Sequence, residues 1–240
     1  MSGGQGTIIA KRSVSLSKTY PVLGIVLALA AVLVSSSSGA IGNLSTIPLN
    51  ATATSSLDLT KTLPLVSVVL QVFAAIIFAT PVLMLYVYDK NNGTLEYFLS
   101  LGMNQGDIYR QYLKAALILA SGLVGFDVVV DVVAGLIEGT SGFLPLEVSG
   151  LVVAMAIPTV SFGTLTMMSF SSLQKQRVGS NQPLGMAIGI FTVLPAYVVP
   201  FALPSLAFEI DLLLAGLVAV LSLLMYLASS RLISREKLLP

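Results

Sequence analysis

The chain has 240 residues, of which 55% are hydrophobic and 10% are charged, and its formal net charge at pH 7 is +1. A mean hydropathy of +0.94 lies far above that of soluble globular domains. Because one helical span needs roughly 20 apolar residues, the length suits about six spans and leaves no room for a separate soluble domain. The composition therefore predicts a single transmembrane domain over residues 1–240, in a multi-pass protein of the cell membrane.

Several residue types and motifs that enzymes use are missing from the sequence. It contains no Cys and no His, which removes thiolate chemistry and the commonest general base and metal ligand. The dipeptide Gly-Lys is also absent, so there is no P-loop to hold nucleotide phosphates. We expect this chain to be no enzyme by itself, to hold no metal or cofactor, and to have no nucleic-acid partner.

Apolar segments follow one another along the chain and predict an all-α bundle of six transmembrane helices. They are Tyr20–Ile41, Leu63–Tyr88, Ala115–Ile137, Val148–Phe170, Leu184–Leu203 and Leu212–Ser229. In such a bundle every backbone polar group is satisfied within its own helix or by a neighbour. A cleaved signal peptide is the alternative for the first segment, because basic residues precede an apolar core, Val22–Val34, and the small residues Ser35–Ala40.

The distribution of basic residues orients the predicted bundle. With six spans both termini share one face, and nearly every Lys and Arg falls in the tails or in the second and fourth loops. Only Lys61 falls on the other face, which the positive-inside rule makes the outside. The predicted cytoplasmic parts are an amphipathic N-terminal segment, 1–19, the loop 89–114 and the tail 230–240, whereas residues 42–62 form an outer loop.

The predicted cytoplasmic connection 89–114 is longer than a turn and has a helical pattern. After a breaker of Asn and Gly, Thr94 can cap a short helix. Its apolar positions, which recur at helical spacing, are Leu95, Phe98, Leu99 and Leu101. Gly102 ends this helix, and a second start signal at Asn104, with Asp107 in the first turn, opens a helix that runs into the third span. The pair forms either a protein-docking element or an amphipathic hairpin lying on lipid.

The short helix begins with Gly93-Thr94-Leu95-Glu96 and continues with Phe98-Leu99-Ser100. This pattern resembles the loop between spans two and three in the membrane subunits of ATP-binding-cassette exporters of the second type. There a Gly-Thr-Leu-Glu helix is followed by a Leu-Leu-Ser-like run, a turn, and a helix that ends near a basic residue. The later positions correspond here to Ile108 and Lys114. Where that family usually has a Pro after the turn, this chain has Leu101-Gly102-Met103.

The resemblance implies a permease that pairs with a second permease, identical or related, and with two nucleotide-binding ATPase subunits that bind ATP and Mg²⁺. In such proteins the Gly-Thr-Leu-Glu helix is the coupling helix, which is seated in a groove of the ATPase subunit. The coupling residues carried over to this chain are Gly93, Thr94, Leu95, Glu96, Phe98 and Leu99. An apolar helix face with Glu96, Asp107 and Arg110 around it agrees with a docking role.

Two carboxylates, Asp127 and Asp131, lie four residues apart on one face of the third span. Charges buried in hydrocarbon are costly unless they are protonated, paired or hydrated, so such groups usually face an interior path. One interpretation is therefore a polar lining for a substrate or cation. In the other, the helix starts earlier, near Arg110, and both carboxylates approach the outer interface, where they are solvated.

The fifth span contains Pro195 and Pro200, and Pro204 follows directly, which is too many prolines for an uninterrupted helix. The exporter family places short re-entrant helices between spans five and six on the outer side, and Ala196–Phe208 fits that element. The alternative is an ordinary helix kinked near Pro195 and a plain outer loop.

The sequence favours the membrane-spanning subunit of an ATP-driven exporter. One alternative is an ATP-independent secondary transporter or channel that uses Asp127 and Asp131 as its coupling site. Another is a permease of the mechanotransmission type, although its large outer domain does not suit these short outer loops. A membrane scaffold without transport activity is the third.

Overall fold

The computed structural model describes residues 5–44, 59–137, 144–173 and 206–232. Over these ranges it contains seven α-helices and no strand. They are α1 Gln5–Leu16, α2 Thr19–Leu44, α3 Leu59–Asn91, α4 Thr94–Ser100, α5 Gln105–Ile137, α6 Leu144–Leu173 and α8 Ala207–Leu232. The predicted all-α class is confirmed for the described part of the chain.

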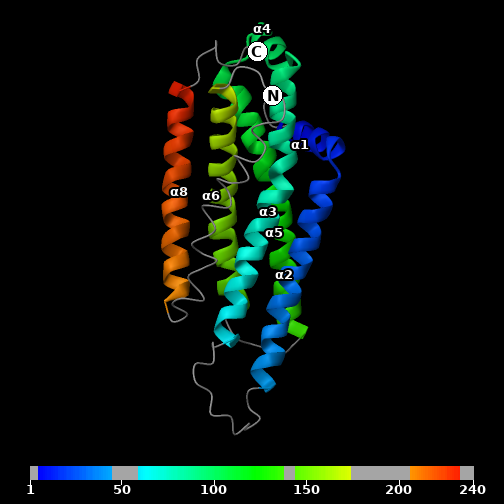
Figure 1. Ribbon diagram of the computed structural model, residues 1–240, viewed down its shortest axis with the longest axis vertical. Helices are drawn as coiled ribbons and strands as arrows, with labels where there is room; N and C mark the ends of the chain where they lie inside the picture. Colours follow the sequence, from blue (N-terminus) through cyan, green and yellow to red (C-terminus); the bar gives the residue numbers. More distant parts are fainter. Residues whose placement is uncertain (1–4, 45–58, 138–143, 174–205, 233–240) are drawn as a thin grey trace.

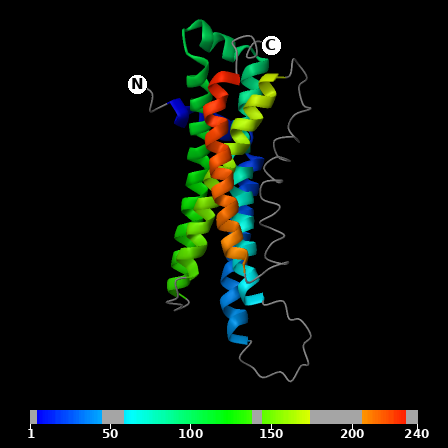
Figure 2. The same ribbon diagram turned by 90° about the vertical axis from the view of Figure 1, so that its left-hand side faces the viewer.

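The long helices α2, α3, α5, α6 and α8 run side by side along the long axis of the molecule (Figure 1, Figure 2). The helix α3 is central, because it packs against α2, α5 and α6, and α8 packs mainly on α6. Buried apolar residues recur along α3 from Val68 to Leu85. They are Val68, Val69, Val72, Ala75, Ala79, Val82 and Leu85. Since residues three and four apart share a helix face, this spacing gives α3 a continuous core surface.

Four described segments are long and apolar enough to cross a membrane. They are Val66–Asn91, Gln105–Val133, Ser149–Ser169 and Glu209–Ala228. A fifth candidate is the pair Gly6–Leu16 and Thr19–Val34, which is bent by 94°. The chain is thus a helical multi-pass membrane protein with four to five candidate spans among its described residues. The predicted fifth span, Leu184–Leu203, lies outside them.

Because of that bend, α1 lies across the other helices instead of extending α2 (Figure 1). It buries a stripe of small residues, Gly6, Ala10 and Ser13, and packs on α5 and α3. A Cβ atom at Gly6 would lie only 3.2 Å from Lys114 Cβ, so the close approach of α1 to α5 uses the missing side chain. The predicted N-terminal segment is therefore a separate helix docked on the bundle.

Figure 1 shows α4 at one end of the bundle, called the α4 end below. Most of the described basic residues belong to segments near this end. Those that the structure describes there are Lys11, Arg12, Lys18, Lys90, Arg110, Lys114 and Arg231. Among the described Lys and Arg residues, Lys61 alone belongs to the opposite end, where the first turn of α8 contains Glu209. This asymmetry agrees with a cytoplasmic α4 end, which stays a prediction.

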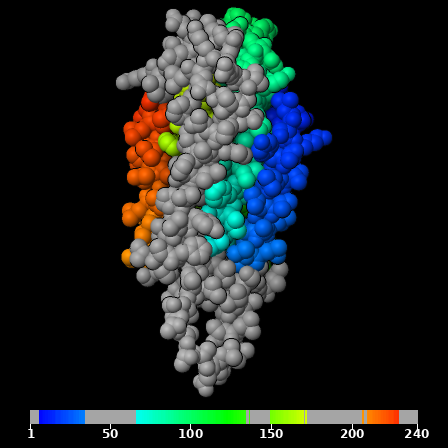
Figure 3. All heavy atoms as spheres, viewed as in Figure 1, coloured from blue at the N-terminus to red at the C-terminus, as the bar shows by residue number. Residues whose placement is uncertain are grey.

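The last described helix, α8, is exposed over most of its circumference. Its buried residues form a narrow stripe of Asp211, Ala215, Val218 and Ser222, while exposed leucines cover the rest. In Figure 3 it forms one edge of the visible face, and α1 and α2 form the opposite edge. Apolar outer surfaces of this kind suit contact with lipid chains.

Candidate functional site

A glycine turn connects α3 to α4. Asn92 and Gly93 separate the two helices, and Gly93 has φ 71°, a left-handed conformation that glycine adopts without steric cost. Gly93 is also the N-cap residue, and no side chain caps the helix there. The predicted capping role of Thr94 is therefore wrong: Thr94 is the first helical residue, and the turn depends on glycine instead.

At its other end α4 closes with a second glycine turn, at the predicted residue. Gly102 has φ 81°, and its N–H donates to the Leu99 carbonyl at 3.0 Å. The N–H of Met103 donates to the Phe98 carbonyl at 3.2 Å. These two bonds define a Schellman motif. In this motif the two residues joined by the longer bond, here Phe98 and Met103, commonly make an apolar contact. Phe98 and Met103 indeed both pack against the core, which fixes α4 to the bundle.

The next helix begins where the sequence predicts. The Asn104 carbonyl accepts the N–H groups of Asp107 at 3.0 Å and Ile108 at 3.2 Å, and α5 runs from Gln105. Asp107 lies in the first turn, where a negative charge is favourable. Its carboxylate is 3.7 Å from Arg110, and both side chains are exposed. These two residues form a charged rim on the first turns of α5, the helix that follows α4 in the sequence.

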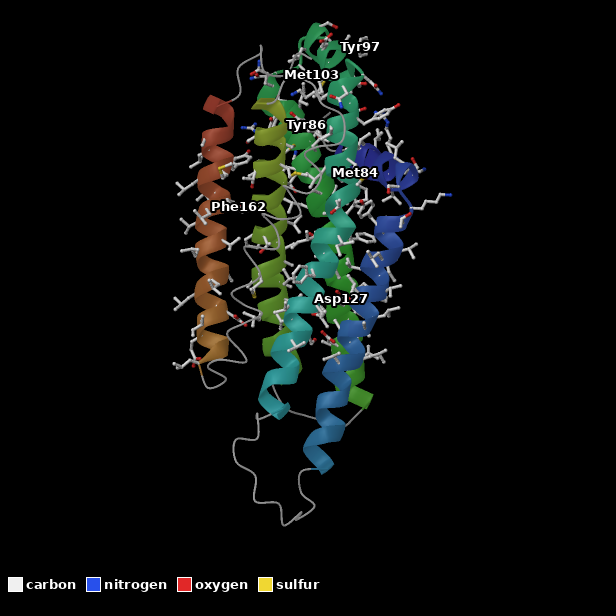
Figure 4. The ribbon with its side chains drawn as sticks, viewed as in Figure 1. Met84, Tyr86, Tyr97, Met103, Asp127 and Phe162 are labelled. Carbon is white, nitrogen blue, oxygen red and sulfur yellow. The ribbon has the colours of Figure 1, made fainter. Side chains whose placement is uncertain are left out.

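The two faces of α4 differ in what they offer to a partner. Leu95 is completely buried, and Phe98 and Leu99 pack against the same core. The outward apolar side chains are instead Tyr97 and Leu101, with exposed fractions of 61% and 62%. Figure 4 shows Tyr97 at the α4 end of the molecule. The anchor expected at Leu95 and Phe98 thus faces the bundle, and helical spacing alone did not identify Tyr97 on the other side of the helix.

Three buried tyrosines lie next to this element inside the bundle. The ring of Tyr86 meets Tyr109 and Tyr112 edge to face, with ring centroids 5.6 Å and 5.2 Å away. The Tyr86 hydroxyl donates to the Tyr109 hydroxyl at 3.1 Å, which donates to the Met168 carbonyl at 2.9 Å. These contacts join α3, α5 and α6 near the point where α4 is attached.

A charged group extends the same network to α1. The hydroxyl of Tyr112 donates to Asp89 Oδ2 at 2.5 Å, and Arg12 Nη2 lies 3.0 Å from Asp89 Oδ1. The adjacent Lys90 donates to the Ser171 carbonyl, one of the last carbonyls of α6, which have no partner within the helix. This network was not predicted from the sequence. A signal was present, because Tyr86 and Asp89 are three residues apart on α3, and Tyr109 and Tyr112 are three residues apart on α5.

The predicted carboxylate pair lies inside the bundle, toward the end of α5 away from α4 (Figure 4). Asp127 is completely buried and Asp131 is 7% exposed. Gln71 of α3, which is also completely buried, donates its Nε2 to Asp131 Oδ2 at 3.0 Å. Among the described residues, neither carboxylate oxygen of Asp127 nor the side-chain oxygen of Gln71 has a hydrogen-bond partner.

The positions of Asp127 and Asp131 test the two interpretations of this pair, a polar lining of a path or solvated groups at the outer interface. The helix does start earlier than Ala115, at Gln105, as the solvated alternative requires. That alternative is nevertheless wrong about solvation, because both carboxylates are buried in protein. At 1.5 Å per residue, Asp127 lies about 20 Å along α5 from Lys114, well within a hydrocarbon core of about 30 Å if Lys114 marks its edge. The spacing of the two carboxylates on α5 did not predict Gln71 of α3 as a partner.

Of the other candidate site residues, some are buried and some lie outside the described residues. Asp211, which directly precedes the predicted sixth span, is completely buried on α8. In the parts of the chain that the structure describes, no three His, Cys, Asp or Glu residues are grouped so that they could hold a metal ion. Pro195, Pro200 and Pro204 lie outside the described residues, so the re-entrant element stays a prediction.

No family model, no curated protein and no solved structure matches this chain. What the fold and the site define is a class: a helical membrane protein with four to five candidate spans in the part of the chain that the structure describes, and a short helix fixed between two of them.

Proposed function

We propose that the chain is the membrane-spanning subunit of an ATP-driven exporter, resembling the permeases of ATP-binding-cassette exporters of the second type. In this role it pairs with a second permease and binds separate nucleotide-binding subunits, which carry ATP and Mg²⁺. The observation that carries the proposal is α4, a seven-residue helix that begins with Thr-Leu-Glu directly after its N-cap Gly93 and is placed between two candidate spans at the basic end of the bundle.

The attachment of α4 supports a coupling role. A partner can transmit force to the spans only through an element that moves as a whole and does not deform. Short turns at Gly93 and Gly102 leave little slack between α4 and the helices on either side, and Leu95 anchors α4 in the core. A partner that displaces α4 would therefore displace the ends of α3 and α5 together.

The buried network gives that displacement a route into the rest of the chain. Tyr86 and Asp89 of α3 are bonded to Tyr109 and Tyr112 of α5, and Arg12 adds α1. Buried hydrogen-bonded groups resist separation because each unpaired group would cost free energy. We infer that α1, α3, α5 and the end of α6 move as one body when the nucleotide-binding subunits close.

The docking surface of α4 is proposed to be Tyr97 and Leu101, beside the rim formed by Asp107 and Arg110. Aromatic and aliphatic anchors surrounded by charged residues are typical of compact protein interfaces. Replacing both anchors by Asp would place carboxylates in the partner's groove, where unpaired charges are costly. The doubly substituted chain should reach the membrane, but lose its ATPase partner on purification and lose ATP-dependent export.

The matched control is the conservative pair Tyr97→Phe and Leu101→Met, which keeps the apolar surface and should keep the partner. Both variants are compared for thermal stability in detergent, because docking is tested only if the fold is intact. If the Tyr97→Asp/Leu101→Asp chain retained a bound and coupled ATPase, Tyr97 and Leu101 would not be the docking surface, and α4 would lose its proposed role as the coupling helix.

The second candidate function is an ATP-independent secondary transporter or channel. The specific observation in its favour is the buried pair Asp127 and Asp131, because ionisable groups within spans often mark ion or substrate pathways. Purification of the tagged chain from its own membranes separates the two proposals. A co-purifying P-loop ATPase favours the exporter, and transport by the chain alone in liposomes without ATP favours the secondary transporter.

A further inference from the structure

The buried polar group around Asp127 contains more hydrogen-bond acceptors than donors. Asp127 offers two carboxylate oxygens and Gln71 offers its side-chain oxygen, and none of the three has a partner among the described residues. The Nε2 donor of Gln71 is used by Asp131. Buried polar atoms in native proteins are normally satisfied, so three adjoining exceptions need a physical explanation.

No Lys or Arg of the described ranges lies close enough to neutralise Asp127. Leu123, Val124 and Val128, which flank Asp127 on α5, belong to the apolar core or pack against it, as do Val68 and Val72 of α3. Of the Lys and Arg residues in the described ranges, all but Lys61 belong to the α4 end. Lys61 is ten residues from Gln71, about 15 Å along a helix, which is too far for a direct ion pair. An isolated carboxylate in such surroundings is strongly disfavoured.

We propose that Asp127, Asp131 and the side-chain oxygen of Gln71 bind a monovalent metal cation of the Na⁺ type between α3 and α5. Carboxylate and amide oxygens suit hard cations, and the absence of Cys and His from the sequence removes the ligands that softer metals prefer. A single positive charge would compensate the carboxylate of Asp127, which accepts no hydrogen bond from the described residues, whereas the carboxylate of Asp131 is already stabilised by the amide of Gln71.

The amide of Gln71 has two functions in this site. Its N–H group donates to Asp131 and holds that carboxylate in place. Its oxygen has no hydrogen-bond partner among the described residues and is available as a further ligand of the cation. Because α3 and α5 contribute to the same site, a bound cation would stabilise the packing of these two helices. The site is independent of the docking surface on α4, so it stands or fails separately from the exporter proposal.

The test uses the full chain purified in detergent without any partner. Thermal unfolding is measured at constant ionic strength while NaCl replaces the chloride of N-methyl-D-glucamine, a cation too large for a site between two helices. A ligand that binds only the folded state raises the unfolding temperature in a saturable way. We expect this rise with Na⁺, and direct binding of radioactive ²²Na⁺ with the same midpoint concentration.

Three variants assign the effect to the site. Asp127→Asn keeps the shape of the side chain and removes the charge, so it should fold and lose both the rise and the binding. Gln71→Ala should bind about tenfold more weakly, as expected for loss of a group that orients a ligand. Asp107→Asn, which changes an exposed carboxylate in the same helix, should retain both effects.

Several results would overturn the proposal. These are an unfolding temperature that does not respond to Na⁺, a response that only divalent cations or a change of pH produces, and an unchanged response in Asp127→Asn. Because ²²Na⁺ binding is measured on the unsubstituted chain as well, the answer does not depend on any variant folding.

Discussion

The hydroxyl of Tyr112 on α5 donates a 2.5 Å hydrogen bond to the carboxylate of Asp89 on α3, and both side chains are 1% exposed. Across this bond the beginning of one candidate span is held to the end of another. Arg12 approaches the same carboxylate from α1, and its side chain is 45% exposed. The relationship thus connects the bundle interior with the helix that lies across it.

Removing the hydroxyl tests this connection. In Tyr112→Phe the ring can keep its edge-to-face contact with Tyr86, while Asp89 loses a buried donor. A hydrogen bond to a charged group contributes about 2 kcal/mol, and we expect a loss of stability of that size. The measurement is denaturant unfolding in detergent. Tyr88→Phe, at an exposed position of α3, is the control and should change little. Equal stability of both variants would mean that the bond contributes nothing.

The outward and inward residues of α4 should respond differently to the same substitution. Leu95→Asp places a carboxylate in the core and should destabilise the chain by about 3 kcal/mol or more. Tyr97→Asp changes an exposed side chain and should alter stability by about 0.5 kcal/mol. Expression level and thermal unfolding of the two variants, compared in one experiment, measure the difference. If Leu95→Asp proved as stable as Tyr97→Asp, Leu95 would not be the anchor of α4.

The contact between α2 and α3 depends on a missing side chain. A Cβ atom at Gly24 would lie 3.1 Å from Phe78 Cβ and 3.2 Å from the Ala74 carbonyl oxygen. Because one of these neighbours is backbone, Gly24→Ala should force the helices apart and cost about 1–3 kcal/mol. Gly216→Ala on α8 meets nothing within 4 Å and should not destabilise the chain. Equal unfolding temperatures for the two alanine variants would contradict this packing.

The orientation of the bundle is tested by single cysteines, which are unique because the sequence has none. Ser100→Cys is exposed at the α4 end and Leu206→Cys is exposed just before α8, at the opposite end. In intact cells a membrane-impermeant thiol reagent should label the second and not the first. Labelling should reach the first after permeabilisation. The reverse pattern would place α4 outside the cell and exclude docking to a cytoplasmic ATPase.

Much of the fold follows from local sequence properties. Apolar length predicts the helices that became α2, α3, α5, α6 and α8, because a backbone in lipid can satisfy its polar groups only within helices or closed barrels. The sequence also predicts the turn at Gly102 and the helix start after Asn104. Both are local features, because glycine and asparagine influence the backbone conformation of the residues next to them.

Only tertiary structure decided which faces are buried and which polar groups meet. The apolar positions of α4 indicated a helix but not whether Leu95 would face a partner or the core, because either surroundings would bury an apolar side chain. The Asp127 and Asp131 spacing placed both on one face, but Gln71 comes from a helix 60 residues away from Asp131 in sequence. The bonds of Tyr112 and Arg12 to Asp89 are equally non-local. Such contacts depend on how helices pack, and helical periodicity describes each helix alone.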